Sequence, residues 1–308
     1  MHAQALTKAG LPFVLSTIHW PMAQFEQQGH VGPLKLLHRA LSSVPADVAK
    51  NGVRALLADG PWRTPLLAAA PTPWDDRVAF LLSNARCLLP NSNAEAAVLR
   101  ELGARGRIAP VVNATEPPPA EAATALLPRG LPPKFLLSAG RIEPRKNQLA
   151  LVEALAGFRM PLVLVGDPGP MHANYLRRVR TAAVRAGAMV LPAQPRPTLF
   201  ALLQKAQAHV APAWYETPGL VSLEAAAAGT RVVTTDRGST REYFGDQAIY
   251  LDPAHATSMR AAVGQALGQP KDLTLRARVL KEFTWARAGE QTLAAYRGAL
   301  DGPAEVAA

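Results

Sequence analysis

The fold of this 308-residue chain is decided around one stretch, Pro212-Ala-Trp-Tyr-Glu216-Thr-Pro-Gly219-Leu-Val-Ser-Leu-Glu224-Ala. The apolar run that ends at Pro212 predicts a buried strand, and the sequence from Gly219 predicts a helix. Glu216 then lies in the loop between them, whereas Glu224 lies more than one turn into the helix.

The start of this predicted helix is suited to an anionic ligand. Its first N–H groups have no partner within the helix, and they point into the space beyond the strand. A negatively charged ligand there would have one carboxylate on each side, Glu216 and Glu224. Such carboxylates are explained most simply if they accept hydrogen bonds from hydroxyl groups, which sugars supply.

Composition indicates a soluble globular protein, for which a cytoplasmic enzyme is the default expectation. Its length allows two domains, 49% of its residues are hydrophobic, and its mean hydropathy is +0.03. No apolar run reaches the roughly 18 residues that a membrane span needs. The single cysteine, Cys87, excludes internal disulfides and is predicted to be a small core residue. We expect a cytoplasmic location.

The net charge of +10 is concentrated in one part of the chain, because residues 129–187 hold ten basic and three acidic side chains. A phosphate-bearing ligand, an anionic membrane or nucleic acid would each explain such an excess. No basic stretch interleaved with aromatic residues supports nucleic acid. Four arginines are predicted to form a solvated helix face, with membrane contact as the next interpretation: Arg177, Arg178, Arg180 and Arg185.

The N-terminal part predicts a small α/β domain. Expected helices cover residues 3–9, Leu34–Leu41, Arg77–Asn84 and 93–102, and residues 51–73 are interrupted by prolines. Expected strands are Phe13–Ile18, which ends before His19 and Trp20, Cys87–Leu89 and Ile108–Val112. Ser92 is predicted to cap the fourth helix, with Glu95 completing a capping box. Asp75 and Asp76 are predicted to start a helix.

A proline-rich stretch divides the chain. Residues 115–133 contain six prolines, which predicts a linker between domains at 1–128 and 129–308. In the second domain short apolar runs alternate with helical segments, which indicates a parallel sheet covered on both faces. Ligands of such sheets bind beyond the carboxyl ends of the strands.

Arg141 and Lys146 follow the first strand of this second domain. Gly140 permits a sharp turn, and two cations near helix N-termini suit a diphosphate. An ordinary basic surface loop is the alternative. Neither a Gly-x-Gly-x-x-Gly fingerprint nor a lysine-bearing P-loop is present, which weakens the dehydrogenase and nucleotide-triphosphatase interpretations.

Taken in order, these segments resemble the donor domain of retaining glycosyltransferases of the GT-B fold, family 4, the glycosyl transferases group 1. The matching residues include Ser138-Ala-Gly-Arg141-Ile-Glu-Pro-Arg-Lys146-Asn147, Val165-Gly-Asp167, the E-x7-E pair Glu216 and Glu224, and Phe283-Thr-Trp285. The resemblance implies an α/β protein with two Rossmann-like domains facing a cleft. Here the N-terminal domain lacks the family's Gly-rich first βαβ region and is expected to be incomplete, through truncation or as a natural short form. The last helix, about 285–300, is expected to pack back toward it.

The resemblance also implies a role for each matching residue. Arg141 and Lys146 would hold the diphosphate of the donor beside Gly140, and the backbone amides of Gly219, Leu220 and Val221 would add to that cradle. Glu224 would bind the ribose, and Glu216 the transferred sugar. Two further residues are implied: His19 on the acceptor side and Leu191 near the base. For His19, a structural role at the end of its strand is the alternative. No metal or other cofactor is implied.

The resemblance therefore predicts a bacterial, retaining hexosyltransferase. It would transfer a sugar from a nucleotide-diphosphate donor to a cell-surface glycan or lipid-linked acceptor, as in polysaccharide or lipopolysaccharide biosynthesis. Its expected location is cytoplasmic, with peripheral contact at the inner face of the membrane as an extension and no nucleic-acid partner. The alternative is a non-catalytic protein that binds sugar nucleotides or a partner.

Overall fold

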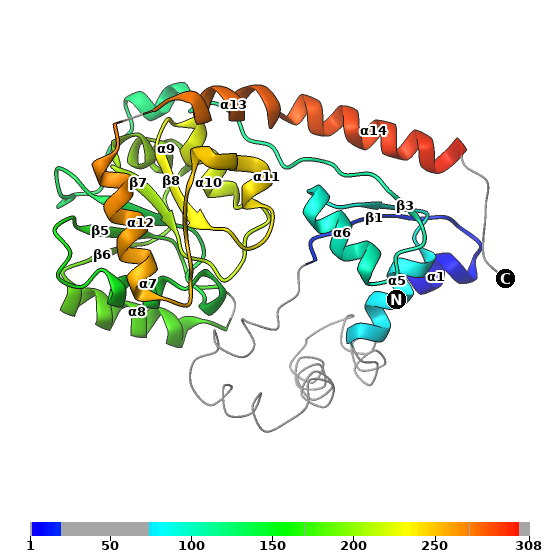
Figure 1. The fold of residues 1–308 in the computed structure, drawn as a ribbon, viewed down its shortest axis with the longest axis horizontal. Coiled ribbons are helices and arrows are strands. Elements are labelled where there is room, and N and C mark those ends of the chain that lie inside the picture. The colour runs from blue at the N-terminus through cyan, green and yellow to red at the C-terminus, as the bar shows by residue number, and fades with distance from the viewer. Residues whose placement is uncertain (1, 20–73, 170, 271, 302–308) are drawn as a thin grey trace. The chain divides into compact units, whose positions relative to one another are not determined.

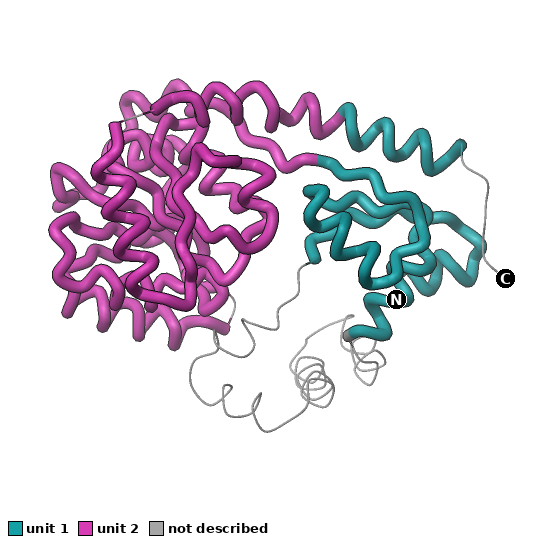
Figure 2. The backbone as a smooth tube through the Cα atoms, in the orientation of Figure 1, with its two compact units in different colours: residues 1–111, 290–308 teal, residues 112–289 magenta. Residues whose placement is uncertain are grey.

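A computed structural model describes residues 2–19, 74–169, 171–270 and 272–301. The chain divides into two compact units: unit 1 comprises residues 1–111 and 290–308, and unit 2 comprises residues 112–289 (Figure 2). The predictions for Trp20, Leu34–Leu41 and residues 51–73 lie outside the described residues.

Unit 2 is built on a six-stranded parallel sheet (Figure 1). The spatial order is β6-β5-β4-β7-β8-β9, so the two strands at its centre are not consecutive in the chain. The strands are β4 (Leu136–Ala139), β5 (Leu162–Val165), β6 (Met189–Leu191), β7 (Ala208–Ala211), β8 (Arg231–Thr235) and β9 (Ile249–Leu251). Each corresponds to a short apolar run of the sequence, and the predicted parallel sheet is confirmed.

Helices cover both faces of this sheet (Figure 1). One layer contains α7 (Gln148–Ala154), which contacts α8 (Ala173–Ala186) and α12 (Ala256–Gly268). The other contains α10 (Leu220–Ala227), which contacts α9 (Arg196–Lys205) and α13 (Thr274–Glu282). The short helix α11 (Thr240–Phe244) follows β8. Helix α7 ends at Ala154, and three residues further on Gly157 takes a left-handed φ of 70°.

One core layer of unit 2 lies between the sheet and the helices α9, α10 and α13. Phe135, Leu137, Val163, Phe200 and Val232 are among its side chains, each no more than 2% exposed. Truncating such a side chain costs about 2–5 kcal/mol, because a cavity remains.

The proline-rich stretch is part of unit 2 and does not separate the units as predicted. Its 3₁₀ turn, η3 (Ala120–Ala123), contacts α9, and Ala122 is only 5% exposed. Leu127 and Leu131 pack against the core of unit 2. Unit 2 therefore begins at residue 112 rather than 129, because the apolar residues among the prolines pack against its core.

Unit 1 contains a three-stranded parallel sheet in the described residues, in the order β1-β2-β3. These strands are β1 (Val14–Ser16), β2 (Cys87–Leu89) and β3 (Arg107–Ile108), and the helices are α1 (His2–Lys8), α5 (Trp74–Asn84) and α6 (Asn93–Glu101). The third strand is shorter than predicted because Pro110 has no N–H group to donate. Cys87 is fully buried, as predicted. Asp75 and Asp76 lie in the first turn of α5.

The N-terminus of α6 confirms one predicted cap and shows more than the motif implied. Ser92 Oγ accepts a hydrogen bond from the N–H of Glu95 at 3.0 Å. The buried carboxylate of Glu95 accepts from the backbone N–H groups of Asn91 and His19, at 2.9 and 2.6 Å. Glu95 thus joins α6 to the end of β1 within unit 1.

The last helix, α14 (Trp285–Asp301), begins in unit 2 and ends in unit 1. Within unit 1, its Ala295 and Ala299 pack against Cys87 and Leu89. In the part of the chain that the structure describes, no helix combines the length and the apolar character needed to cross a membrane.

Candidate active site

The predicted donor-site residues of unit 2 follow the carboxyl ends of its strands. Strands β4 and β7 are neighbours at the centre of the sheet, and the connections leave them in opposite directions. Ligands of open α/β sheets bind at such a switch point. Arg141 and Lys146 follow β4, and Glu216 follows β7.

Two glycines bring the loops after β4 and β5 close together. Gly140 has φ 143° and donates its N–H to the carbonyl of Val165 at 2.9 Å. A Cβ atom on Gly166 would lie 1.9 Å from the carbonyl oxygen of Gly140. Only a glycine fits at position 166, so the backbone itself forms this part of the site.

The 3₁₀ turn η4 (Pro144–Lys146) presents the lysine. It ends at Asn147, whose φ of 60° is left-handed and whose Nδ2 donates to the carbonyl of Pro253 at 2.9 Å. The N–H of Trp214 donates to the carbonyl of Arg145 at 2.9 Å. That bond joins the loop after β4 to the loop after β7.

These loops place Lys146 and Glu216 in direct contact. Lys146 Nζ donates to Glu216 Oε1 in a salt bridge. The Glu216 side chain is 5% exposed and that of Lys146 is 22% exposed. An ion pair with this little exposure is weakly screened by solvent and salt.

The backbone of Glu216 is held by the loop after β8. Its N–H donates to the carbonyl of Arg237 at 3.1 Å, and its carbonyl accepts from the N–H of Ser239 at 2.9 Å. A Cβ atom on Gly238 would lie 2.0 Å from that carbonyl oxygen. Gly219, with φ 89°, lies on the carboxylate side, where a Cβ atom would be 3.3 Å from Glu216 Cδ.

Gly219 also begins helix α10. Its carbonyl accepts from the N–H groups of Ser222 and Leu223, at 2.9 and 3.1 Å. Gly219, Leu220 and Val221 supply the first N–H groups of the helix, which by helix geometry have no partner within it. Leu220 is 54% exposed. The buried carboxylate of Glu216 therefore stands beside the positive end of the α10 dipole.

Arg141 lies apart from the Lys146–Glu216 contact. Its side chain is 62% exposed, and Nη2 is 3.7 Å from Oε1 of Glu143. Arg145, which the sequence analysis did not single out, forms the shorter salt bridge with Glu143, at 3.0 Å. Arg145 also donates to the carbonyl of Tyr215 at 3.4 Å. The sequence included Arg145 in the segment that resembles the family, but it assigned the residue no role.

Glu224 occupies the second turn of α10, as predicted, and pairs with a residue that the sequence did not indicate. Arg196 of α9 donates to Glu224 Oε1 at 3.2 Å and to Glu116 Oε2 at 3.1 Å. Burial raises the pKa of Glu224, and Arg196 opposes that shift. No spacing rule could have identified Arg196, because it lies 28 positions from Glu224.

His209 is a third residue that the sequence did not single out as functional. It lies on β7 and is 1% exposed. Burial and, to a lesser extent, the positive charge of Lys146 lower the pKa of His209, a hydrogen bond with the backbone of Leu137 opposes them, and the resulting pKa is about 4. Among the described residues, no partner meets its Nδ1. A neutral imidazole therefore lies within reach of the charge of Lys146.

Leu191 and His19 complete the predicted set. Leu191 ends β6 half-buried, and its carbonyl accepts from the N–H of Gly166 at 3.1 Å. His19 belongs to unit 1, where its N–H is bound by Glu95. Burial lowers the pKa of His19, while the carboxylates of Glu95 and Asp75 oppose the shift. Of the predicted catalytic residues, Lys146 and Glu216 are the two in direct contact.

The fold is that of the GT-B glycosyltransferases. The structure is similar to sucrose-phosphate synthase from Thermosynechococcus elongatus, with a TM-score of 0.64, 22% identity, and coverage of 97% of this chain and 76% of that one. It is also similar to Anabaena HepE in complex with UDP and glucose, with a TM-score of 0.66, 17% identity, and coverage of 96% and 74%.

Residues 127–280 match the family described as Glycosyl transferases group 1, and the chain belongs to that family. It is 36% identical over 186 residues to a D-inositol 3-phosphate glycosyltransferase of Jonesia denitrificans, covering 54% of this chain and 44% of that protein. It is 30% identical over 177 residues to O-antigen chain mannosyltransferase B of Escherichia coli, covering 53% and 45%. The chain spans about half the length of the curated relatives it matches.

Proposed function

We propose that the protein transfers a sugar from a nucleotide-diphosphate donor to a hydroxyl-bearing acceptor, with retention of anomeric configuration. The observation that carries this proposal is the Lys146–Glu216 pair at the switch point between β4 and β7. In this pair a cation and a carboxylate lie beside the N-terminus of α10, where they would contact the diphosphate and the sugar of a bound donor.

In this proposal Lys146 binds the diphosphate without leaving Glu216. An ammonium group has three N–H donors, and Glu216 Oε1 accepts one of them. The others are available for phosphate oxygens. As the glycosidic bond breaks, negative charge grows on the diphosphate, and Lys146 and the helix N-terminus stabilise it more than they stabilise the intact donor.

Arg141 supplies the second cation. At 3.7 Å its contact with Glu143 is too long for a strong hydrogen bond, so the exposed guanidinium can turn to the leaving phosphate at low cost. The pair of cations would neutralise the diphosphate. Gly140 leaves room for the ligand to approach the backbone, because no atom lies within 4 Å of the position that a Cβ would take there.

The carboxylates would bind the sugar parts of the donor. Glu216 is held on both sides by backbone hydrogen bonds, so it can accept from hydroxyls of the transferred sugar in a fixed geometry. Glu224 would accept from the ribose, beside Arg196. Backbone groups near Leu191 would contact the base. For the acceptor, likeness to an O-antigen chain mannosyltransferase supports a cell-surface glycan or lipid-linked saccharide.

The test is transfer by variants at the central pair. Thermal-shift screening with nucleoside diphosphates first identifies the base, since a ligand that binds the folded state raises the melting temperature. Lys146→Ala and Glu216→Gln should then each lower transfer about a hundredfold. The surface variant Lys134→Ala is the matched control and should transfer normally.

Two outcomes would contradict the proposal. Unchanged transfer in Lys146→Ala would remove the lysine from the mechanism. Nucleoside diphosphate binding without transfer or donor hydrolysis, across a panel of acceptors, would instead indicate a non-catalytic binding protein.

A further inference from the structure

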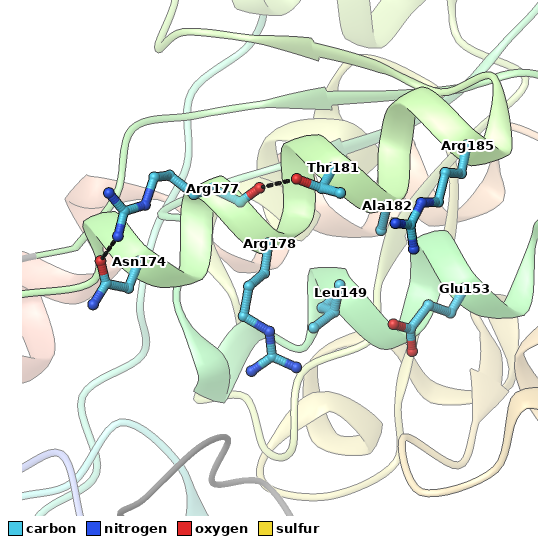
Figure 3. Close-up of a pocket in the computed structure, with 8 residues that line it drawn as sticks. All are labelled: Leu149, Glu153, Asn174, Arg177, Arg178, Thr181, Ala182 and Arg185. Atoms are coloured by element: carbon cyan, nitrogen blue, oxygen red, sulfur yellow. Dashed lines mark hydrogen bonds between the residues drawn. The ribbon is translucent and has the colours of Figure 1, made fainter.

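A basic groove lies between α7 and α8, and its lining includes none of the predicted donor-site residues. Its volume is about 480 Å³, within the range of small-molecule sites. It is lined by Leu149, Glu153, Asn174, Arg177, Arg178, Thr181, Ala182 and Arg185 (Figure 3). Figure 3 shows Arg178 and Arg185 extending from α8 on the side where α7 carries Leu149 and Glu153.

The walls of the groove are fixed to each other. The hydroxyl of Tyr175, a buried residue of α8, accepts the N–H of Leu149 at 3.0 Å. Val179 and Ala183 of α8 are buried as well, which holds the helix on the body of unit 2. The groove residues therefore project from a rigid frame rather than from a loop.

Two of its cations have no counter-ion in the part of the chain that the structure describes. Among the described residues, no ion pair or hydrogen bond is formed by the side chain of Arg178 or by that of Arg185. Arg177 differs, because it donates to Asn174 Oδ1. Residues 173–186 contain no acidic side chain. Two unpaired guanidinium groups on one side of a helix suit the oxygens of a phosphate group.

The opposite wall adds a single carboxylate, Glu153, which forms no ion pair with any described residue. It would repel a bare anion but would accept hydrogen bonds from hydroxyl groups beside a phosphate. The lining thus favours a ligand that carries both groups.

We propose that the α7–α8 groove is a second anion site, which binds a phosphate ester bearing hydroxyl groups. Arg178 and Arg185 bind the phosphate, and Glu153 accepts from a hydroxyl. A soluble phosphate ester and the headgroup of an anionic lipid share this chemistry. The site does not depend on the proposed transferase function.

Arg180 provides an internal control for this proposal. It lies on the same helix and is exposed, but it is absent from the groove lining. At 100° per residue it points about 160° away from Arg178. A general attraction of anions to α8 would involve Arg180 as much as Arg178, whereas a groove site would not.

In the experiment, glycerol 3-phosphate is titrated into the full chain at low ionic strength, and binding is followed by the phosphorus NMR signal of the ligand. Glycerol, which lacks the phosphate, is the control ligand and should not bind. Arg178→Ala and Arg185→Ala should each weaken binding about tenfold. Arg180→Ala should leave it unchanged. Glu153→Gln should strengthen binding of inorganic phosphate, because it removes a like charge. Binding should persist in Lys146→Ala, which separates the groove from the candidate active site.

A parallel measurement uses vesicles of phosphatidylglycerol, with phosphatidylcholine as control. Vesicle binding that needs Arg178 and Arg185 but not Arg180 assigns the phosphate to a lipid, and glycerol 3-phosphate binding alone assigns it to a soluble ester. Equal losses in Arg178→Ala and Arg180→Ala, no binding of either probe, or loss of binding in Lys146→Ala would overturn the proposal.

Discussion

Lys146 donates a hydrogen bond to the carboxylate of Glu216, a residue 70 positions away in the chain. The contact joins the loops after β4 and β7, the two strands on either side of the switch point. A backbone hydrogen bond from Trp214 to Arg145 runs beside it. The Lys146–Glu216 pair therefore contributes to the stability of unit 2 and also takes part in the proposed sugar transfer.

Removing Lys146 alone should destabilise the protein more than removing both charges. Lys146→Ala leaves the carboxylate of Glu216 without its cation at a largely buried position, at a cost of about 1–3 kcal/mol. Glu216→Gln alone keeps a hydrogen-bond acceptor for the lysine and should cost less. Urea unfolding of the two single variants and of the double variant measures the coupling. Additive effects would mean that the two side chains do not interact.

His209 should make unit 2 acid-sensitive. Its pKa is lowered from 6.5 to about 4, so the unfolded chain binds the proton first as the pH falls. The contribution of neutral His209 to stability is complete above pH 6.5 and is lost as the pH falls toward 4. Over that window the loss is about 3 kcal/mol.

Unfolding free energies measured between pH 7 and 4 check this effect. His209→Gln, which cannot take up a proton, should flatten the acid side of the profile, whereas His172→Gln serves as a control at a less buried position. An unchanged slope in His209→Gln would exclude His209 as the titrating group.

The sequence predicted the strands of unit 2 well because their signal is local. Short apolar runs bounded by glycine or proline indicate buried parallel strands, and their order places Lys146 and Glu216 at carboxyl ends. The contact between the two residues was not predictable from spacing, since it needs β4 and β7 to be neighbours. Arg196 and Glu224 show the same limit, because α9 and α10 meet only in the folded unit.

The compact unit 2 begins before the predicted domain boundary for a related reason. Proline content indicates an extended backbone, but it does not indicate whether that backbone is packed. Leu127 and Leu131 lie among the prolines and cover the core of unit 2, so the stretch belongs to the compact unit. Composition alone could not distinguish a proline-rich stretch that packs on the core from an exposed linker.

Glu224 should give stability an opposite dependence on pH. Burial raises its pKa, so the folded chain retains the proton longer than the unfolded chain. The contribution of Glu224 to stability is therefore complete below the pKa that it has in the unfolded chain. It is lost as the pH rises through the higher pKa that it has in the folded chain. Glu224→Gln should remove that loss, and Arg196→Ala should enlarge it, because the opposing cation is gone.

Unfolding measured from pH 4 to 8 on these two variants distinguishes the effects. If Arg196→Ala left the dependence of the unfolding free energy on pH unchanged, the salt bridge between Arg196 and Glu224 would not contribute to stability. A donor titration on the same variants would also show whether Glu224 contributes to ribose binding, where Glu224→Gln should weaken binding about tenfold.

Replacing Gly238 with alanine should destabilise the protein more than the same replacement of a helical glycine that has free space around it. It has φ 101°, and a Cβ atom there would lie 2.0 Å from the carbonyl oxygen of Glu216. Gly238→Ala must therefore push the loop after β8 away from Glu216, at a cost of about 2–4 kcal/mol. Gly264→Ala is the matched control, since it lies within α12 with no atom within 4 Å of the new Cβ. It should stabilise the protein by about 0.5–1 kcal/mol. Thermal unfolding and donor binding of both variants test the prediction, and a Gly238→Ala protein with normal stability and normal donor affinity would show that the Glu216 loop does not depend on this close approach.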